Sequence, residues 1–375
     1  MSESRNSQSR PRLCFVGPMI GRNPGYLHTP GEILSDKFLE SGFPVISISA
    51  FSNRYWRLAD IVHTLIQRRH SIDIMMLQVY GERSFVVEDI ASRLGRRFRH
   101  RIVMFLHGGT LPRFFARFPR WTRRVLARAD ALVTPSEFLA RAVRDYGYRA
   151  KVIPNVLDLS QYPYRHRCKP NPHLFWMRAF HHWYNPLMAI RVLAAVRSRI
   201  EGATLVMAGQ DKGLEFQALQ LARKLGVDGA VRFTGFLDAT RKIIEADAAD
   251  VFLNTNNVDN MPVSILEACA MGLPVVATRV GGISDLLKDE ETGLLVPNDD
   301  SDAMATAICR LFQEPGLAER LSANGRQLAE RCSWEQVYPL WERLLADVLA
   351  GMSERAHEST LTGKVQTNTA HQKHF

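Results

Sequence analysis

The sequence predicts an α/β protein of two doubly wound domains, each a parallel sheet with helices on both faces. Short apolar runs that end near glycine or proline alternate with segments of helical periodicity along most of the 375 residues. This alternation is typical of repeated strand–helix–strand units. The series is interrupted once, by a polar, proline-containing stretch over residues 162–172, and then restarts. A chain of this length can bury two cores of ordinary size.

The first half supplies the elements of one such domain. The expected strands are 13–16, 45–48, 72–77, 102–106, 131–133 and 151–153. A loop with Gly21 and Gly25 follows the first strand, and a helix follows the loop. Ser136 can begin a helix over 136–146, because its hydroxyl can accept from a free backbone N–H. We expect an N-terminal domain over residues 11–165.

The second half repeats the pattern and then ends differently. The expected strands are 173–176, 203–207, 231–233, 251–254, 274–277 and 293–296, within a C-terminal domain over 170–333. Apolar residues at helical spacing, from Trp334 to Leu344, then predict an amphipathic helix over 334–350. The tail 351–375 is polar and without periodicity, and we expect it to be disordered.

Positive charge is concentrated in the first half. The net charge is +10, and residues 1–165 hold 26 Lys and Arg against 13 Asp and Glu. No acidic residue lies between Asp89 and Asp130, where eleven arginines fall, all of them in the segment 93–128. Two interpretations are open: a surface that attracts phosphate groups or an anionic bilayer, or a solvated helical face. No nucleic-acid recognition motif accompanies the charge, so we expect no nucleic acid partner.

Cysteine usage and hydropathy point to the cytoplasm. The five cysteines are odd in number, far apart and without a CxxC pair, which argues against a disulfide framework or a zinc site. The start lacks the apolar run of a signal peptide, and no apolar stretch reaches the ~18–20 residues of a membrane span. We expect a cytoplasmic protein whose only membrane contact is peripheral, at the inner face.

The stretch from 251 to 297 carries the clearest chemistry. A buried strand leads into a polar loop with Asp259, and Pro262 suits the first turn of the helix that holds Glu267. An apolar strand and the Gly281-Gly282 turn follow. Helix starts and glycine turns present free N–H groups that bind diphosphate oxygens without a metal. A carboxylate on the same helix can accept both hydroxyls of a ribose.

This stretch resembles the retaining glycosyltransferases of family 4, also called group 1. The resemblance rests on Asp259-Asn-Met-Pro-Val-Ser-Ile-Leu-Glu267, the small-residue helix after it, the Gly-Gly turn and Gly293-Leu-Leu-Val-Pro297. It covers residues from about 12 to 349. It implies the GT-B fold, in which two facing Rossmann-like domains enclose an interdomain cleft, and a terminal helix that packs back on the N-terminal domain.

The resemblance also implies roles for individual residues. Glu267 would bind the ribose of a nucleotide diphosphate sugar, Asp259 the transferred sugar and Arg178 the diphosphate. The Gly281-Gly282 turn would approach the donor across the cleft. His107, before a Gly-Gly pair at a strand end, would lie beside the donor sugar, although a lone histidine there is often only a local hydrogen-bonding group. The further donor-site candidates are Gly25, Gly209, Lys212, Asn260, Met261, Pro262 and Val263.

Two positions depart from the family pattern. The first acidic position is usually Glu, and Asp259 is shorter by one methylene. The lysine expected after Arg178 is replaced by Trp183 or Tyr184, which leaves Arg178 as the main cation for the diphosphate. These departures bear on whether the sugar contact survives and which donor is used.

Taken together, these features predict a metal-independent, hexosyltransferase-type enzyme of class EC 2.4 that needs no cofactor. We expect it to act in the synthesis of cell-surface polysaccharide, glycolipid or related glycoconjugates, on an acceptor that is lipid-linked or bears phosphate. Asp300-Ser-Asp302 resembles a metal-binding DxD motif but stands where acidic residues favour a helix start. The alternatives are a sugar phosphorylase or epimerase of the same fold, and a non-catalytic nucleotide-sugar-binding protein.

Overall fold

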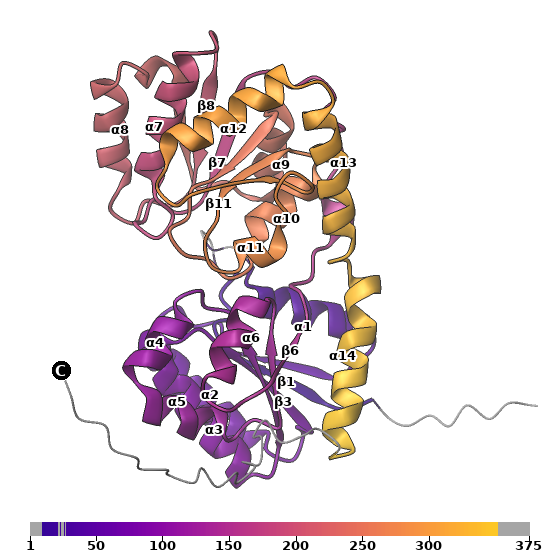
Figure 1. The fold of residues 1–375 in the computed structure, drawn as a ribbon. Helices are drawn as coiled ribbons and strands as arrows, with labels where there is room; N and C mark the ends of the chain where they lie inside the picture. Colours follow the sequence, from indigo (N-terminus) through magenta and orange to yellow (C-terminus); the bar gives the residue numbers. More distant parts are fainter. Residues whose placement is uncertain (1–9, 22, 24–25, 27, 352–375) are drawn as a thin grey trace, which may run out of the picture.

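The computed structural model describes residues 10–21, 23, 26 and 28–351, which form two α/β domains joined by a linker (Figure 1). Each domain contains a six-stranded parallel sheet with helices packed on its two sides. The predicted fold class, two doubly wound domains facing each other, is confirmed. Gly25 of the expected donor site and the expected tail beyond Gly351 lie outside the described residues.

The N-terminal sheet has the strand order β2-β1-β3-β4-β5-β6. Its elements are β1 (Leu13–Val16), α1 (Pro30–Glu40), β2 (Val45–Ile48), α2 (Arg54–Gln67), β3 (Ile74–Val79), η1 (Glu82–Ser84), α3 (Phe85–Arg97), β4 (Arg101–Leu106), α4 (Leu111–Arg117), α5 (Pro119–Leu126), β5 (Ala131–Thr134), α6 (Glu137–Arg144) and β6 (Ala150–Val152). A short 3-10 turn, η2 (Leu159–Gln161), begins the linker, residues 159–172, which joins the N-terminal domain to the first strand of the C-terminal domain.

The C-terminal sheet has the order β12-β11-β10-β7-β8-β9. Its elements are β7 (His173–Met177), α7 (Pro186–Arg197), β8 (Thr204–Ala208), α8 (Glu215–Lys224), η3 (Asp228–Ala230), β9 (Val231–Gly235), α9 (Ala239–Ala248), β10 (Val251–Asn254), α10 (Val263–Ala270), β11 (Val275–Thr278), α11 (Ile283–Leu286), β12 (Leu294–Val296), α12 (Ser301–Gln313) and α13 (Leu317–Glu330). Helix α14 (Trp334–Leu349) follows α13.

All twelve expected strands are present, with small shifts at their ends. The largest shift is at β3, which begins at Ile74 instead of residue 72. The reason is local: the carboxylate of Asp73 accepts from the backbone N–H of Arg12 at 2.7 Å and from its guanidinium. Ser136 is the N-cap of α6, as predicted, and its Oγ accepts from the N–H of Leu139.

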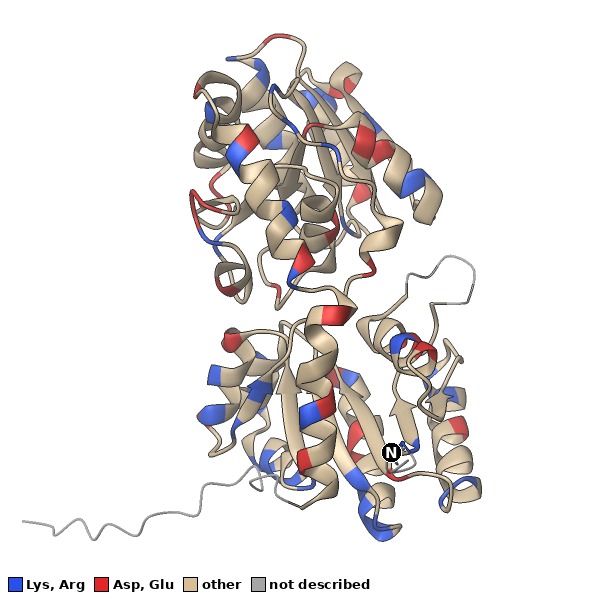
Figure 2. Ribbon diagram, turned by 90° about the vertical axis from the view of Figure 1, so that its right-hand side faces the viewer, with Lys and Arg blue, Asp and Glu red and all other residues tan. Residues whose placement is uncertain are grey.

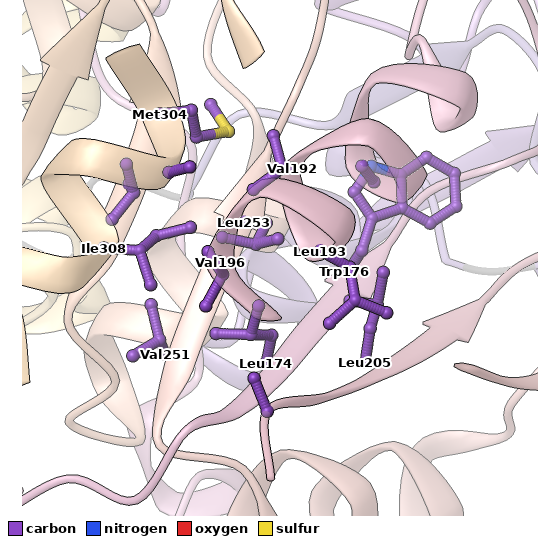
Figure 3. Close-up of a cluster of buried hydrophobic side chains, with 14 of the residues drawn as sticks. Leu174, Trp176, Val192, Leu193, Val196, Leu205, Val251, Leu253, Met304 and Ile308 are labelled. Carbon is purple, nitrogen blue, oxygen red and sulfur yellow. The ribbon is translucent and has the colours of Figure 1, made fainter. Parts of the chain in front are cut away.

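Apolar side chains from both sheets and their helices make the two cores. In the C-terminal domain, α7 and α12 cover one face of the sheet, and Figure 3 shows their side chains interlocking with those of the strands. Examples are Val192 and Val196 on α7, Ile308 on α12, and Leu174 and Leu253 on strands. Helix α7 starts at Pro186, where Asn185 caps it by accepting from the N–H of Met188.

Helix α14 leaves the C-terminal domain and packs on the N-terminal one (Figure 1). Its Trp341 is fully buried, with its ring 5.3 Å from that of Phe105 on β4. Trp334 packs edge-on against Phe38 of α1, and its Nε1 donates to Ser41. The amphipathic pattern is therefore explained by burial against the N-terminal sheet and α1.

Side chains at the carboxyl ends of the strands connect the domains directly. The carboxylate of Asp285 on α11 accepts from the N–H of Phe138 at 2.5 Å and pairs with Arg141 of α6. Asn155 donates from Nδ2 to the carbonyl of Met261 at 3.2 Å. Among the described helices, none combines the length and the apolar content that crossing a membrane requires.

Candidate functional site

A pocket of about 540 Å³ lies between the two domains, at the carboxyl ends of the C-terminal strands. Helix α1 and the linker contribute Lys37 and Tyr162 to its wall. The C-terminal domain contributes Arg178 after β7, Gly209 after β8, and residues of α9 and α10. In a doubly wound sheet these strand ends share one edge, which is the usual position of a ligand site.

Gly209 is forced to be glycine by a close approach of backbone. Its φ is +152°, and an added Cβ would lie 1.8 Å from the carbonyl oxygen of Arg178. The N–H of Gly209 donates to the carbonyl of Gly235 at 2.8 Å. The loops after β7, β8 and β9 therefore touch through their backbones and form one wall of the pocket.

Glu267 is buried in the pocket wall and holds two donors on one oxygen. Its Oε1 accepts from Nζ of Lys242 at 2.5 Å and from the hydroxyl of Tyr162 at 2.8 Å. Burial raises the pKa of Tyr162, and the neighbouring negative charge of Glu267 raises it further. The phenol thus remains a hydrogen-bond donor to the carboxylate across the physiological range.

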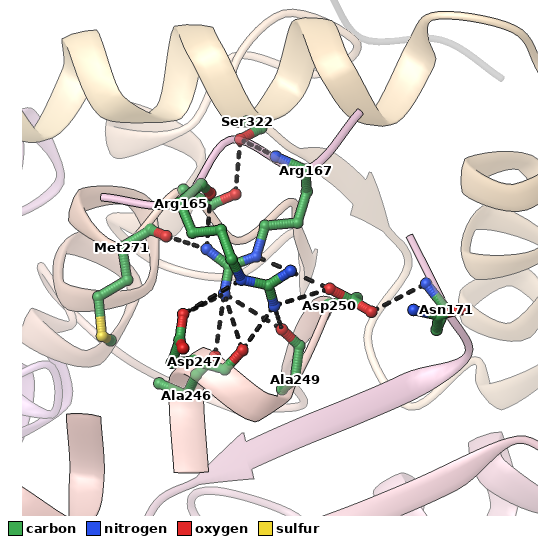
Figure 4. Close-up of polar contacts among 10 residues, drawn as sticks. Arg165, Arg167, Asn171, Ala246, Asp247, Ala249, Asp250, Met271 and Ser322 are labelled. Carbon is green, nitrogen blue, oxygen red and sulfur yellow. Dashed lines mark hydrogen bonds and ion pairs between the residues drawn. The ribbon is translucent and has the colours of Figure 1, made fainter. Parts of the chain in front are cut away.

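The linker that carries Tyr162 is fixed by two arginines three and five residues further on (Figure 4). Arg167 is almost fully buried and donates to the carbonyls of Ala246 and Met271. Arg165 donates to the carbonyl of Ala249 at 2.8 Å and pairs with Asp250. These contacts pin the linker to the C-terminal end of α9, and so hold Tyr162 against Glu267.

Helix α10 begins at the pocket without a side-chain cap. Pro262 is its N-cap, one position earlier than the predicted first-turn placement, and makes no capping hydrogen bond. The first N–H groups of such a helix have no partner within it and favour an anion. Ser264, 6% exposed, lines the pocket, and its Oγ has no hydrogen-bond partner among the described residues. Its hydroxyl and the helix start together form an anion-binding corner.

Arg178 is held from two sides. Its Nη2 forms an ion pair with Oδ2 of Asp259, and its guanidinium lies 4.1 Å from the centre of the Tyr184 ring. Its Nε is buried and without a partner among the described residues. Tyr184, one of the two residues that can occupy the position where the resemblance places a lysine, therefore stacks on Arg178.

Asp259 has both carboxylate oxygens bonded to the protein. Oδ2 accepts from Asn256 at 2.7 Å in addition to Arg178, and Oδ1 accepts from the N–H of Asn260 at 2.8 Å. The carboxylate of Asp259 is thus directed toward Arg178 and toward its own loop. These contacts are what the shorter side chain makes at the position where the resemblance places a Glu.

The Gly281-Gly282 turn packs closely against the backbone of the loop that carries Asp259. Gly281 has φ +51°, and a Cβ there would lie 2.1 Å from the carbonyl oxygen of Asp259. A Cβ on Gly282 would lie 1.9 Å from the carbonyl oxygen of Asn260. Gly109 of the N-terminal domain approaches Asp259 from the other side. The absence of side chains at these glycines allows the 259–260 loop to pack closely between the domains.

His107 lies at the end of β4 and is a neutral imidazole. Its Nε2 meets Oε1 of Gln78 at 2.5 Å, and because that oxygen only accepts, Nε2 carries the proton. Burial lowers the pKa of His107 to about 3. Its ring stacks on Tyr80, and its carbonyl accepts from Nδ2 of Asn260 at 3.1 Å. The backbone of His107 is therefore connected to the 259–260 loop through the side chain of Asn260.

Comparison with known proteins agrees with this architecture. The model of the glycosyl transferases group 1 matches residues 166–328, and that of glycosyltransferase family 4 matches residues 29–161. Together they span most of the chain. The chain belongs to the group 1, family 4 glycosyltransferases.

Curated relatives match about two fifths of this chain. It is 33% identical over 159 residues to the D-inositol 3-phosphate glycosyltransferase of Saccharomonospora viridis, over 40% of this chain and 37% of the relative. It is 36% identical over 151 residues to the lipopolysaccharide core biosynthesis glycosyltransferase LpsE of Rhizobium meliloti, over 40% and 43%. The matched stretches thus span about two fifths of these relatives' length.

Solved structures share the whole fold at low identity. Sucrose-phosphate synthase from Thermosynechococcus elongatus superposes with a TM-score of 0.74 at 18% identity, over 91% of this chain and all of that one. HepE of Anabaena, in its complex with UDP-glucose, gives a TM-score of 0.69 at 18% identity, over 90% and 100%. These likenesses establish the two-domain GT-B arrangement.

The glycosyltransferase site gathers only some of the residues expected from sequence. Arg178, Gly209, Val263 and Glu267 line the pocket. Asp259 is tied to Arg178, and Asn260, Met261 and Pro262 are buried between the pocket and the N-terminal domain. Lys212 is exposed and absent from the described lining. Asp211 turns that loop outward by accepting from the N–H groups of Gly213 and Leu214.

Three residues of the pocket have no strong sequence signal. Lys242 stands in a charged stretch that is typical of a solvated helix face, and Tyr162 lies in the expected domain boundary. Ser264 is one of several small residues in the motif helix. Only the long-range packing of α9, the linker and α10 brings the three together.

Two other features of the chain have residue types that can bind a metal. Asp300 caps α12 by accepting from the N–H of Ala303 at 2.8 Å, which is the helix-start role expected for it. In the part of the chain that is described, one group of possible ligands converges: His166, Cys168 and Glu319, with ligand atoms within 4.8 Å of one another. All three are exposed and lie outside the pocket lining.

Proposed function

We propose that this chain is a retaining glycosyltransferase that takes its sugar from a nucleotide diphosphate sugar without a metal ion. The observation that carries the proposal is the set of unpaired buried donors at the pocket: Nε of Arg178, Oγ of Ser264 and the uncapped start of α10. Buried donors without acceptors cost about 1–3 kcal/mol each. A diphosphate would supply the acceptors, and the pocket volume suits a nucleotide.

The same groups support a route for the reaction. As the sugar leaves, negative charge develops on the nucleotide diphosphate, where Arg178 and the α10 N–H groups would stabilise it. Both oxygens of the Asp259 carboxylate already accept hydrogen bonds from the protein, which disfavours a double displacement through this residue. We propose that the acceptor hydroxyl attacks the anomeric carbon on the face that the diphosphate leaves and gives its proton to the departing diphosphate, with retention of configuration.

A thermal-shift screen tests donor binding. UDP-, GDP-, ADP-, CMP- and dTDP-sugars are added to the intact protein in EDTA, because a ligand of the folded state raises Tm by mass action. We expect one nucleotide family to raise Tm, and the same donor to lose most of its effect on Glu267→Gln. A cooperative melt that no donor shifts contradicts the proposal. The anomeric configuration of the product, determined by NMR, decides between retention and inversion.

We further propose that the acceptor is presented at an anionic surface, such as a lipid-linked saccharide at the inner face of a membrane. Figure 2 shows many Lys and Arg positions, coloured blue, along the ribbon of the N-terminal domain. Asp89 there is shared by three arginines, Arg93, Arg124 and Arg128. Exposed arginines around them, such as Arg97, Arg113 and Arg120, have no acidic partner among the described residues. The excess positive charge favours an anionic partner.

Liposome co-sedimentation tests this surface. At low salt we expect the protein to sediment with phosphatidylcholine vesicles that contain about 30% phosphatidylglycerol. We expect it to stay in solution with vesicles of pure phosphatidylcholine. The triple change Arg113→Glu, Arg120→Glu, Arg123→Glu should abolish sedimentation, whereas Arg223→Glu on α8 should not. Equal sedimentation of both variants contradicts this surface.

One observation favours a second candidate, a non-catalytic nucleotide-sugar-binding protein. Both oxygens of Asp259 are hydrogen-bonded to the protein, although the family resemblance assigns the sugar contact to this position. Such a protein binds the donor but never consumes it. Incubation of the identified donor with a lipid extract, followed by assay of released nucleotide diphosphate, separates the two candidates.

A further inference from the structure

Lys242 is the only buried lysine among the residues that the structure describes, and it is 7% exposed. It lies on α9, in the pocket wall. Its Nζ donates to Oε1 of Glu267 at 2.5 Å and stands 5.3 Å from the centre of the Tyr162 ring. A lysine is almost never buried unless its charge is paired.

Stability alone does not account for this pair. Desolvation of two charges offsets most of their attraction, and apolar residues of similar volume are often as stable in their place. The position is also next to an apolar cluster, including Leu237 and Ala246, that could accommodate a methionine. The ion pair therefore points to a function at the pocket.

The arrangement leaves the two oxygens of Glu267 unequal. Oε1 is bonded by Lys242 from α9 and by Tyr162 from the linker, two elements that approach it independently. No described residue donates to Oε2, and Glu267 lines the pocket. The two donors thus fix the rotamer of the carboxylate and present a single oxygen to a ligand.

We propose that Lys242 is a positioning residue for the ribose of the donor, acting through Glu267. The inference rests on the proposed function, in which Glu267 binds the ribose hydroxyls of a nucleoside diphosphate. Lys242 holds Oε1, so that Oε2 meets the hydroxyls in one fixed geometry. Its ammonium also adds positive charge to a pocket whose ligand is an anion, but that contribution does not depend on the ribose.

Calorimetric titration distinguishes the two contributions. The nucleoside diphosphate that the wild-type protein binds is compared with its 2′,3′-dideoxy analogue on the full chain. A hydrogen bond to a charged group implies at least about tenfold weaker binding of the analogue to the wild-type protein. For Lys242→Met we expect the ribonucleotide to bind about tenfold more weakly and the discrimination to fall to about twofold. Tyr162→Phe should lower the discrimination partly, and Lys242→Arg should retain most of it.

The matched control is Lys224→Met, the same change at an exposed position on α8. It should leave both dissociation constants unchanged. If Lys242→Met weakens both nucleotides by the same factor, Lys242 contributes only charge and the inference is overturned. Should that variant fail to fold, Lys242→Leu takes its place, and unchanged discrimination in that variant overturns the inference equally. A wild-type protein that binds no nucleoside diphosphate refutes the proposed function itself, which is a separate outcome.

Discussion

Asp259 forms an ion pair with Arg178, which lines the interdomain pocket, and its carboxylate is bonded on both oxygens. The pair joins the loop after β10 to the residue after β7, two neighbouring strands of the sheet. Tyr184 stacks on the guanidinium, so Arg178 is restrained by a carboxylate and an aromatic face. The departure at position 259 and the departure at position 184 thus act on the same cation.

This pairing predicts how Asp259→Asn affects binding. Because both oxygens are directed to groups of the protein, we expect the change to alter the affinities for the nucleotide diphosphate and its sugar derivative by the same factor. We expect the ratio of the two dissociation constants to stay within about twofold of the wild-type ratio. Calorimetric titration of both ligands measures it.

The opposite result is equally clear. If Asp259 contacts the transferred sugar, Asp259→Asn weakens only the sugar derivative and the ratio changes about tenfold or more. Asp238→Asn, at the exposed N-cap of α9, is a control that keeps the type of substitution and lies outside the pocket lining.

Ser264→Ala should change stability and binding in opposite directions. The Oγ of Ser264 is buried without a partner among the described residues, so its removal relieves a desolvation cost of about 1 kcal/mol and raises Tm slightly. The same change removes a donor from the anion-binding corner, and the affinity for the nucleotide diphosphate should fall about three- to tenfold. Thermal unfolding and titration are measured on the same preparation. A variant with lower Tm and unchanged affinity would show that Oγ serves the fold instead.

The sequence predicted the sheets well because each strand is a local apolar run between turn residues. It also placed Arg178, Gly209 and Glu267 at one site, since the ends of parallel strands must meet at one edge. Lys242 and Tyr162 could not be found in this way. They lie 25 and 105 residues from Glu267, on a helix and on a linker, and nothing local to either distinguishes it from a solvated residue.

The loop 259–263 shows the other limit of sequence reasoning. A polar loop before a helix has the same pattern whether it faces a ligand or a second domain. Here Asn260 donates to the carbonyl of His107, and Met261 accepts from Asn155, so this part of the loop is committed to the domain interface. Its glycine neighbours are needed for that close packing, which is a property of the assembled domains.

Trp341→Ala tests the docking of α14. The side chain is fully buried between Phe105 and Phe38, so the change should lower the free energy of unfolding by about 3–5 kcal/mol. Trp341→Phe should cost much less, because Nε1 has no partner among the described residues and the ring contacts remain. Urea unfolding followed by circular dichroism gives both values. Equal stability of the alanine variant and the wild type would mean that α14 contributes little to the N-terminal domain.

Glu88 makes the stability of the protein depend on pH. Its carboxyl is buried on α3, where Oε1 accepts from the N–H of Tyr80 at 2.9 Å and from Ser84 at 3.0 Å, while Oε2 has no partner among the described residues. Burial raises its pKa to about 8, from an ordinary value of 4.5. Between these two values the folded protein holds a proton that the unfolded chain has lost.

The raised pKa of Glu88 makes the free energy of unfolding fall as the pH rises. Below pH 4.5 both states are protonated and the contribution is fully present, and it is lost as the pH rises through the folded value near 8. Stability should fall by up to about 1.4 kcal/mol per pH unit from this group. Glu88→Gln keeps the acceptor and cannot ionise, so its stability relative to wild type should rise steadily from pH 5 to pH 8.

The control Glu201→Gln, at an exposed position, should stay parallel to the wild type. The difference between variant and wild type also removes the contribution of His107, whose lowered pKa gives the opposite trend. Parallel curves for Glu88→Gln and wild type would mean that the Glu88 carboxyl is ionised in the folded protein, so that a buried negative charge accepts from the N–H of Tyr80.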